Sequence, residues 1–329
     1  MKRNYHPSRP GVVAASRLLN LSPISDHVDR WDRALSNYDA MIRAKGGSRL
    51  VELDARREDL PTARRRRSPP SNVEVTENDA LPLLTKGQLL DVIVEWKFLK
   101  GKPRNALRPL LRSNSDSSVV SASRRAFAAA DGIITTPTTM DVDIVGDGGS
   151  GDSGGHRRDN DDDGSTRGEM IANAVNCMCE IRGVGPATAS AVLCLYRPDV
   201  FAYMDDEVIE CLYDGRRGYT LGIYKEVNRR CTEIACQLNE AAGMKERKKG
   251  CGDSEGSFSP SSSSSGGGGW TPCKVGKALW SVATMSAYGD ERGLSTIFNG
   301  VDATCVEGGN GSNENAKSTQ KSRKRTKRD

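Results

Sequence analysis

Apolar side chains recur at steps of three and four residues through much of this chain, which is the spacing of a helix that buries one face. A Thr85-x-x-Gln88 capping box begins one of these stripes and Gly101 ends it. Thr271 and Pro272 supply an N-cap and an N1 proline for the last stripe. The pattern shows no comparable run of strand alternation, so the sequence predicts an all-α fold. The predicted helices cover residues 28–42, 85–99, 105–111, 117–130, 170–181, 186–196, 221–238 and 272–280.

Polar, low-complexity stretches interrupt the helical pattern. One combines four arginines with a Pro-Pro pair, one is rich in Gly and Asp, and one contains SSSSSGGGG. Such segments bury too little apolar surface to offset the entropy of ordering. We therefore expect one helical domain over residues 21–301 after a flexible N-terminus, residues 1–20. The expected disordered parts are the insertions 62–78, 141–164 and 245–269 and the basic tail 302–329.

Charge and cysteine usage narrow the class of protein. The 329 residues carry 48 Lys and Arg against 43 Asp and Glu, a net charge of +5 that excludes a uniformly basic packaging protein. No stretch approaches the ~18 consecutive apolar residues of a membrane span, so no membrane partner is expected. The N-terminus lacks the apolar stretch of a secretory signal. Nine cysteines without paired spacing favour reduced thiols in an intracellular compartment.

The stretch 180–212 carries the most specific pattern. An apolar helix ends at Gly183-Val184-Gly185, and Pro186 begins the next helix. Two glycines let the chain reverse with its backbone amides turned outward, and the second helix adds its positive N-terminal dipole. This combination predicts an anion site, for which a DNA phosphate is the natural occupant. The alternative is that the glycines form only a tight connection between two packed helices.

Two neighbouring acids follow this hairpin. After Arg197-Pro198, an apolar, strand-like passage over residues 200–204 leads to Asp205 and Asp206 at the start of a further helix. Aspartate is a favoured N-cap residue, so capping alone explains an acid in this place. The pair also allows one carboxylate to cap the helix while the other faces a cleft.

Residues 181–208 resemble the signature of the helix-hairpin-helix DNA glycosylase superfamily. Asp205 lies 18 residues after Ala187, the register that this family uses between its hairpin helix and its catalytic aspartate. The matching residues are Gly183, Val184, Gly185, Thr188, Ala189, Asp205 and Val208. Most of the remaining ordered chain is similar to the eukaryotic Amun-like nuclear proteins. This second resemblance rests on a WDRALxxYD-like start and on the segments TKGQLLDVIVEWKFLKGKPR and WTPCKVGKALW.

The resemblance implies roles for individual residues. Asp205 would be the catalytic carboxylate, and Gly183, Val184, Gly185 and Thr188 would bind DNA phosphate. Ala187 stands where bifunctional members have lysine, so water is the expected nucleophile and strand nicking is not expected. No iron–sulfur cluster and no other metal site is expected, whereas the family resemblance allows a monovalent cation at the hairpin.

The base that such an enzyme removes must enter a pocket that stacks on it and reads its edge. Trp96, Tyr203 and Trp280 are the aromatic candidates and Glu95 and Lys97 the polar ones, with Glu95, Trp96 and Lys97 as the favoured group. The competing interpretation is that each aromatic side chain belongs to the ordinary core, as such residues at helical spacing usually do.

Three hypotheses follow for function. The first is a nuclear, monofunctional DNA glycosylase acting in base-excision repair. The second is a nuclear DNA- or chromatin-binding protein that keeps the fold without catalysis, and the third is a helical protein-interaction module. The arginine run 64–67 and seven basic residues between 317 and 328 suit salt-sensitive phosphate contacts, but short basic runs equally serve as nuclear import signals.

Overall fold

The computed structural model describes residues 10–20, 23–60, 84–134, 162–213, 217–249 and 269–299. Within these ranges every regular element is a helix and no strand occurs, so the all-α prediction is confirmed. None of the helices described combines the length and the apolar character needed to cross a bilayer.

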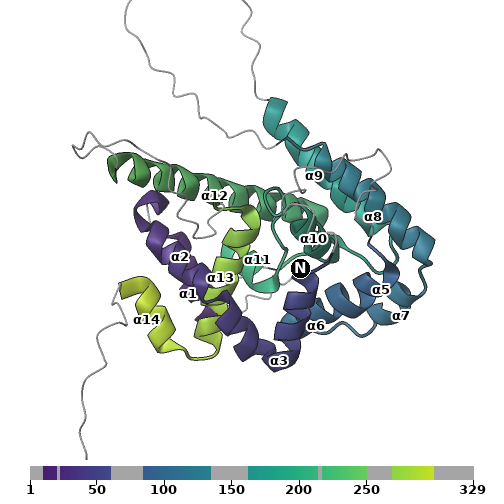
Figure 1. Ribbon diagram of the computed structural model, residues 1–329, viewed down its shortest axis with the longest axis horizontal. Helices are drawn as coiled ribbons and strands as arrows, with labels where there is room; N and C mark the ends of the chain where they lie inside the picture. Colours follow the sequence, from purple (N-terminus) through teal and green to yellow (C-terminus); the bar gives the residue numbers. More distant parts are fainter. Residues whose placement is uncertain are drawn as a thin grey trace, which may run out of the picture.

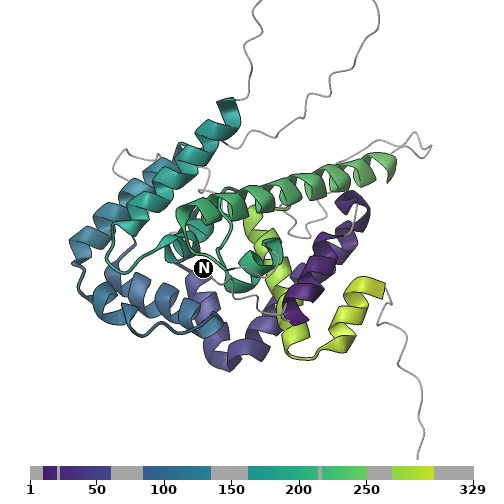
Figure 2. The same ribbon diagram turned by 180° about the vertical axis from the view of Figure 1, so that it is seen from behind.

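Helix α13 (Pro272–Ala287) runs through the middle of the molecule (Figures 1 and 2). Its buried residues lie all around its axis, including every position from Ala278 to Met285, as expected for a helix surrounded by neighbours. The Thr271 hydroxyl accepts a hydrogen bond from the Lys274 amide at 3.2 Å, which confirms the predicted N-cap. The helices that contact α13 are α1 (Pro10–Leu19), α2 (Val28–Ser36), α3 (Tyr38–Glu58), α11 (Asp206–Leu212), α12 (Leu221–Lys249) and α14 (Glu291–Asn299).

A second group of helices flanks this centre. Helix α8 (Asp116–Asp131) packs along α9 (Asp162–Cys179), and α10 (Pro186–Tyr196) contacts both of them (Figure 1). Helix α10 also contacts α12, which joins this group to the central one. A short 3-10 turn (Ile24–His27) precedes α2, and α7 (Leu107–Arg112) precedes α8.

The segment after Thr85 departs from a regular α-helix. The capping box forms as predicted, with Thr85 and Gln88 exchanging hydrogen bonds of 3.2 and 3.0 Å. Helix α5 (Lys86–Gln88) then passes into a π-helical stretch, η2 (Leu89–Val94), and into α6 (Glu95–Lys100), which ends at Gly101. Such π turns occur mostly as single bulges within α-helices, and periodicity does not reveal them.

The prediction that residues 1–20 are flexible is wrong for residues 10–19, which form α1. Ala15 and Leu18 are fully buried against α13 and α11. The side of α1 that carries Ala14, Ala15 and Leu18 is buried, whereas Val13 is 50% exposed, and Pro10 stands at the first turn of the helix.

Several other boundaries shift by a few residues. The predicted helix 28–42 is divided at Asn37 between α2 and α3, and α3 continues past a local break at Gly47, where φ is +60°. Helix α9 begins at Asp162 and α12 extends to Lys249, so both enter segments predicted to be disordered. The insertion 62–78 and the tail 302–329 lie outside the described residues.

We expect α1 to contribute to global stability. Leu18→Ala should lower the free energy of unfolding by about 2–4 kcal/mol, because Leu18 is fully buried and the truncation leaves a cavity. Val13→Ala is the matched control, since Val13 lies on the same helix and is 50% exposed. Chemical denaturation measures both values. An equally small change for the two variants would contradict the docking of α1.

Candidate functional site

The turn between α9 and α10 is held by glycine geometry and by one asparagine. Gly183 has φ +83°, and a side chain there would also crowd Leu110 and Leu111 at 3.1–3.3 Å. The buried Asn114 clamps the turn, because its Oδ1 accepts from the Arg182 amide at 2.9 Å and its Nδ2 donates to the Arg182 carbonyl at 3.0 Å. The hairpin is therefore packed rigidly against α7.

The opposite side of the same hairpin is open. Gly185 has extended backbone, and nothing lies within 4 Å of the position that its side chain would take. Gly185 is the N-cap of α10 and gives the helix no side-chain cap. In the described part of the chain the amides of Gly185 and Ala187 have no hydrogen-bond partner. Free amides at the N-terminus of an 11-residue helix form an anion-binding surface.

Buried polar side chains fix the passage from α10 to Asp205. Asn228 is 1% exposed; its Nδ2 donates to the Val200 carbonyl at 3.0 Å and its Oδ1 accepts from the Ala202 amide at 2.6 Å. Ser190, on α10, accepts from the Met204 amide at 3.0 Å. The passage predicted to be strand-like forms no strand, and these side chains satisfy its backbone groups, because no neighbouring strand is present in the described residues.

Asp205 combines the two roles that its position suggested. Its Oδ1 accepts from the Asp206 amide at 2.9 Å and so caps α11, while its Oδ2 forms an ion pair with the ammonium of Lys100. Both side chains of this pair are 3% exposed. The carboxylate nevertheless lines two neighbouring cavities, an outer groove and an interior cavity.

The Lys100 ammonium is buried among aromatic rings. It lies 3.8 Å from the ring centre of Trp280 and 5.2 Å from that of Tyr203, distances at which the ring faces attract a cation. Burial lowers the pKa of Lys100, and the opposite charge of Asp205 partly offsets this effect. The ion pair therefore attaches the end of α6 to the start of α11.

The outer groove brings the predicted hairpin and the predicted carboxylate together. Its empty volume is about 640 Å³ including the mouth, and it opens between the α6–α7 segment, the hairpin and the start of α11. The predicted site residues along it are Gly183, Gly185, Thr188, Lys97, Tyr203 and Asp205, and it is also lined by Lys102, Arg104, Asp206 and Tyr219. Val184 does not line it, because its side chain is 7% exposed and belongs to the core.

Lys97 is the polar pocket candidate that lies in this groove. It has no hydrogen-bond or ion-pair partner among the described residues, and burial lowers its pKa, an effect that Asp205 opposes. Asp206, in contrast, is engaged by Arg217 at 3.0 Å and by the Tyr219 hydroxyl at 2.7 Å. Glu95 lines neither cavity, since its carboxylate is held by Arg108.

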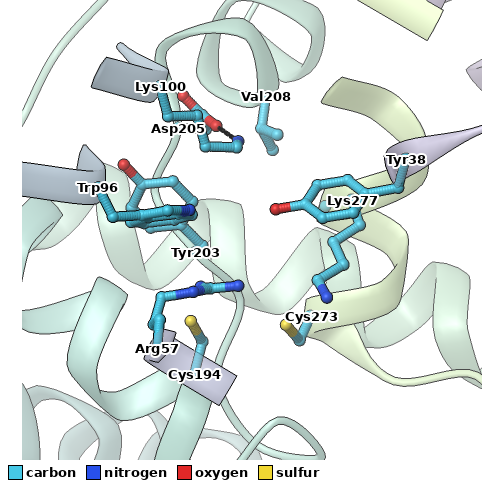
Figure 3. A pocket seen from close by; sticks show the side chains of 11 residues that line it. Tyr38, Arg57, Trp96, Lys100, Cys194, Tyr203, Asp205, Val208, Cys273 and Lys277 are labelled. Carbon is cyan, nitrogen blue, oxygen red and sulfur yellow. Dashed lines mark hydrogen bonds and ion pairs between the residues drawn. The ribbon is translucent and has the colours of Figure 1, made fainter. Parts of the chain in front are cut away.

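The interior cavity borders Asp205 (Figure 3) and has room for about one water molecule. Trp96 and Tyr203 stand against each other on one side of it, with ring centres 5.1 Å apart, and Tyr38 faces them from the other side. The Trp96 indole donates to the carboxylate of Asp54 at 2.6 Å, so the ring is fixed from behind. The Trp280 ring contacts the Lys100 ammonium and does not line the cavity, so Trp280 fits the interpretation as core. Trp96 and Tyr203 line the cavity, so these two rings form part of its wall.

Sequence reasoning missed three residues that organise the site. Lys100 belongs to the same segment as Lys97, but helical spacing alone gave no reason to pair it with a residue far along the chain. Tyr38 falls within the predicted helix 28–42, and Arg57 lies outside every predicted helix. Both are brought to the cavity by α3, whose path depends on long-range packing.

No group of three or more His, Cys, Asp or Glu side chains suited to a metal ion occurs among the described residues. The described cysteines are free thiols, with Cys194 and Cys273 in the wall of the interior cavity. Comparison with known proteins found no protein family, no curated protein and no solved structure that matches this chain.

Glu207 should make stability depend on pH. Burial, and next the neighbouring charge of Asp205, raise its pKa from 4.5 to about 7. A carboxyl with a raised folded-state pKa favours the folded state below its unfolded pKa, and that contribution is lost as pH rises through the folded value. Glu207→Gln should therefore remove a decline in unfolding free energy of about 1–3 kcal/mol between pH 5 and 8. Denaturation curves at several pH values measure it, and parallel pH profiles for the two proteins would contradict it.

Proposed function

We propose that this protein is a DNA glycosylase-like protein of the helix-hairpin-helix type, which hydrolyses the N-glycosidic bond of a flipped base in base-excision repair. Asp205 is the catalytic carboxylate in this proposal, and the hairpin at Gly183 and Gly185 holds a DNA phosphate. DNA is the partner, the nucleus is the compartment, and no cofactor takes part. The resemblance to the Amun-like nuclear proteins supports the nuclear compartment.

One observation carries the proposal: the free amides of the hairpin and the Asp205 carboxylate line the same groove. A phosphate on the amides of Gly185 and Ala187 would place the adjoining sugar of the strand near Asp205. The hairpin contacts backbone and reads no sequence, so it positions DNA of any sequence. Lys97, Lys102 and Arg104 add positive charge along the groove, as a polyanion requires.

The proposed reaction depends on the positive charge that develops on the sugar. Cleavage of an N-glycosidic bond develops positive charge on the sugar, and a buried carboxylate beside the anomeric carbon stabilises that state. In the free protein the Lys100 ammonium forms an ion pair with Asp205, in the place that the positively charged sugar would take. The same carboxylate orients the attacking water, since Ala187 leaves the hairpin helix without an amine nucleophile.

A second function has a specific observation in its favour. Both oxygens of Asp205 are engaged, one by the Asp206 amide and one by Lys100, as in a purely structural aspartate. On that basis the alternative is a nuclear DNA- or chromatin-binding protein that uses the fold and the hairpin without catalysis. Both functions require the hairpin to bind phosphate, and only the first requires Asp205 to recognise a charged sugar.

The hairpin can be tested without disturbing the fold. Gly185→Asp places a favoured N-cap in open space, so thermal stability should be unchanged or slightly raised. Its negative charge should nevertheless weaken duplex DNA binding at least about tenfold at low salt, because it repels the phosphate. Gly185→Asn is the matched control, of equal shape and without charge. Equal affinities of the two variants and the native protein would remove the hairpin from the DNA-binding surface.

The catalytic role is tested with DNA that carries a cationic azasugar, a mimic of the charged transition state. The native protein should bind this duplex at least about a hundredfold more tightly than plain duplex, as enzymes bind such mimics. Asp205→Asn retains an acceptor for the helix cap and should lose this preference while it keeps its affinity for plain duplex.

Removal of Asp205 alone leaves Lys100 buried without its partner, so a second variant guards against misfolding. Lys100→Met combined with Asp205→Asn removes both charges and should also bind the two duplexes equally. Equal, salt-sensitive binding of both duplexes by the native protein would favour the non-catalytic function. No binding to either duplex would leave the protein-interaction module as the surviving hypothesis.

A further inference from the structure

We propose that Cys273 is a thiol that hydrogen peroxide oxidises, and that Cys194 completes this oxidation to a disulfide, which joins the hairpin helix α10 to the central helix α13. The reactant that the site takes is a small, neutral hydroperoxide. The inference concerns a modification of the protein and is independent of the proposed function, because it requires neither DNA nor a catalytic role for Asp205.

The fold brings the two cysteines to the same end of the interior cavity. Cys194 lies near the end of α10 and Cys273 in the first turn of α13, and both line the cavity. The Cys273 amide donates to the Pro198 carbonyl at 3.4 Å, so the start of α13 is held against the loop that follows α10. Figure 3 shows both sulfur atoms on the same side of the cavity, beside the Arg57 guanidinium. The two thiols are therefore neighbours, although they are distant in sequence.

The surroundings of Cys273 favour its thiolate. Cys273 is the second residue of a 16-residue helix, where the helix dipole stabilises an anion. Lys277 follows one turn later, and Figure 3 shows its ammonium next to the Cys273 sulfur. Hydrogen bonding from the Cys194 thiol is the main cause that lowers the pKa of Cys273; the charges of Lys277 and Arg57 lower it further, and burial opposes them.

Cys194 has the opposite character. It is 1% exposed, and its thiol lies 3.5 Å from the Ala191 carbonyl within the same helix. Hydrogen bonding to Cys273 and burial raise the pKa of Cys194, so it stays protonated. A buried thiol of this kind is inert by itself. Because Cys273 is partly exposed, an oxidant from solvent reaches the thiolate first, and Cys194 is the thiol that can react with the product.

The two steps balance with hydrogen peroxide as the oxidant. The Cys273 thiolate attacks one peroxide oxygen and the O–O bond breaks, which gives a sulfenic acid at Cys273 and releases hydroxide. The sulfur of Cys194 then attacks the sulfenic sulfur. The S–O bond breaks as the S–S bond forms, and the departing oxygen leaves as water with the Cys194 proton. The two thiols supply the two electrons that reduce the peroxide.

Mass spectrometry of the full chain tests this directly. The reduced protein is treated with hydrogen peroxide at pH 7 for increasing times, free thiols are blocked with N-ethylmaleimide, and the digest is analysed without reduction. The peptides of Cys194 and Cys273 should appear joined by a disulfide that dithiothreitol removes. Cys236 is the matched control, since it is also partly exposed and burial raises its pKa. Cys273 should be oxidised at least about tenfold faster than Cys236.

Variants separate the roles of the two thiols and of the nearby cation. In Cys194→Ala, Cys273 should accumulate as a sulfenic acid that dimedone labels. In Cys273→Ala, Cys194 should stay reduced. Lys277→Gln should slow the oxidation of Cys273 several-fold, whereas Lys225→Gln, which changes an exposed lysine on α12, should leave the rate unchanged. Thermal melting shows which variants are folded.

The inference would be overturned if Cys273 stayed reduced under peroxide, or if it formed a disulfide with a cysteine other than Cys194. Equal oxidation rates for Cys273 and Cys236, or an unchanged rate in Lys277→Gln, would also contradict it, because the local charges would then not activate the thiol. The native chain decides the disulfide by itself, even where a variant fails to fold. Failure here would leave the predictions for DNA binding and for the azasugar as they stand.

Discussion

The buried ion pair between Lys100 and Asp205 is the constraint on which the site depends. Two side chains that are 3% exposed carry opposite charges into the interior, and neither is tolerated there without the other. The pair attaches the end of α6 to the start of α11, elements separated by about a third of the chain. The rings of Trp280 and Tyr203 surround the ammonium, so the position of the carboxylate is fixed from several directions.

This arrangement explains why one carboxylate borders two cavities of different character. The groove side carries free amides and exposed cations, which suit phosphate. The interior side carries aromatic rings and buried cations around a space for about one water molecule. Asp205 lies between them as a helix cap, so the capping bond that explains its place at α11 also holds it at the boundary. In the proposed function, DNA would lie on the groove side.

Local sequence signals predicted the parts of this structure that depend on neighbours in the chain. The Thr85 capping box, the Thr271 N-cap and the reversal at Gly183 each need only a few consecutive residues, and each is present. The hairpin and Asp205 were selected together and do share the groove. Lys97 and Tyr203, chosen as pocket candidates, line it as well.

Residues whose roles depend on distant partners escaped prediction. Asn114 and Asn228 look like ordinary polar residues in the sequence, because the backbone groups that they bind lie in loops far along the chain. The π-helical stretch at Leu89–Val94 has no periodic signature that separates it from a helix. Glu95, placed in the pocket by its position beside Trp96, instead binds Arg108 on the following helix.

The central claim is that Asp205 contacts a sugar of the DNA strand while the adjoining phosphate binds the hairpin. A crystal structure of the protein bound to duplex DNA with the azasugar tests it most directly. The account predicts the cationic nitrogen about 3 Å from an Asp205 oxygen, Lys100 moved away from that oxygen, and a phosphate on the amides of Gly185 and Ala187. A duplex bound on another face, with the Lys100–Asp205 pair intact, would contradict it.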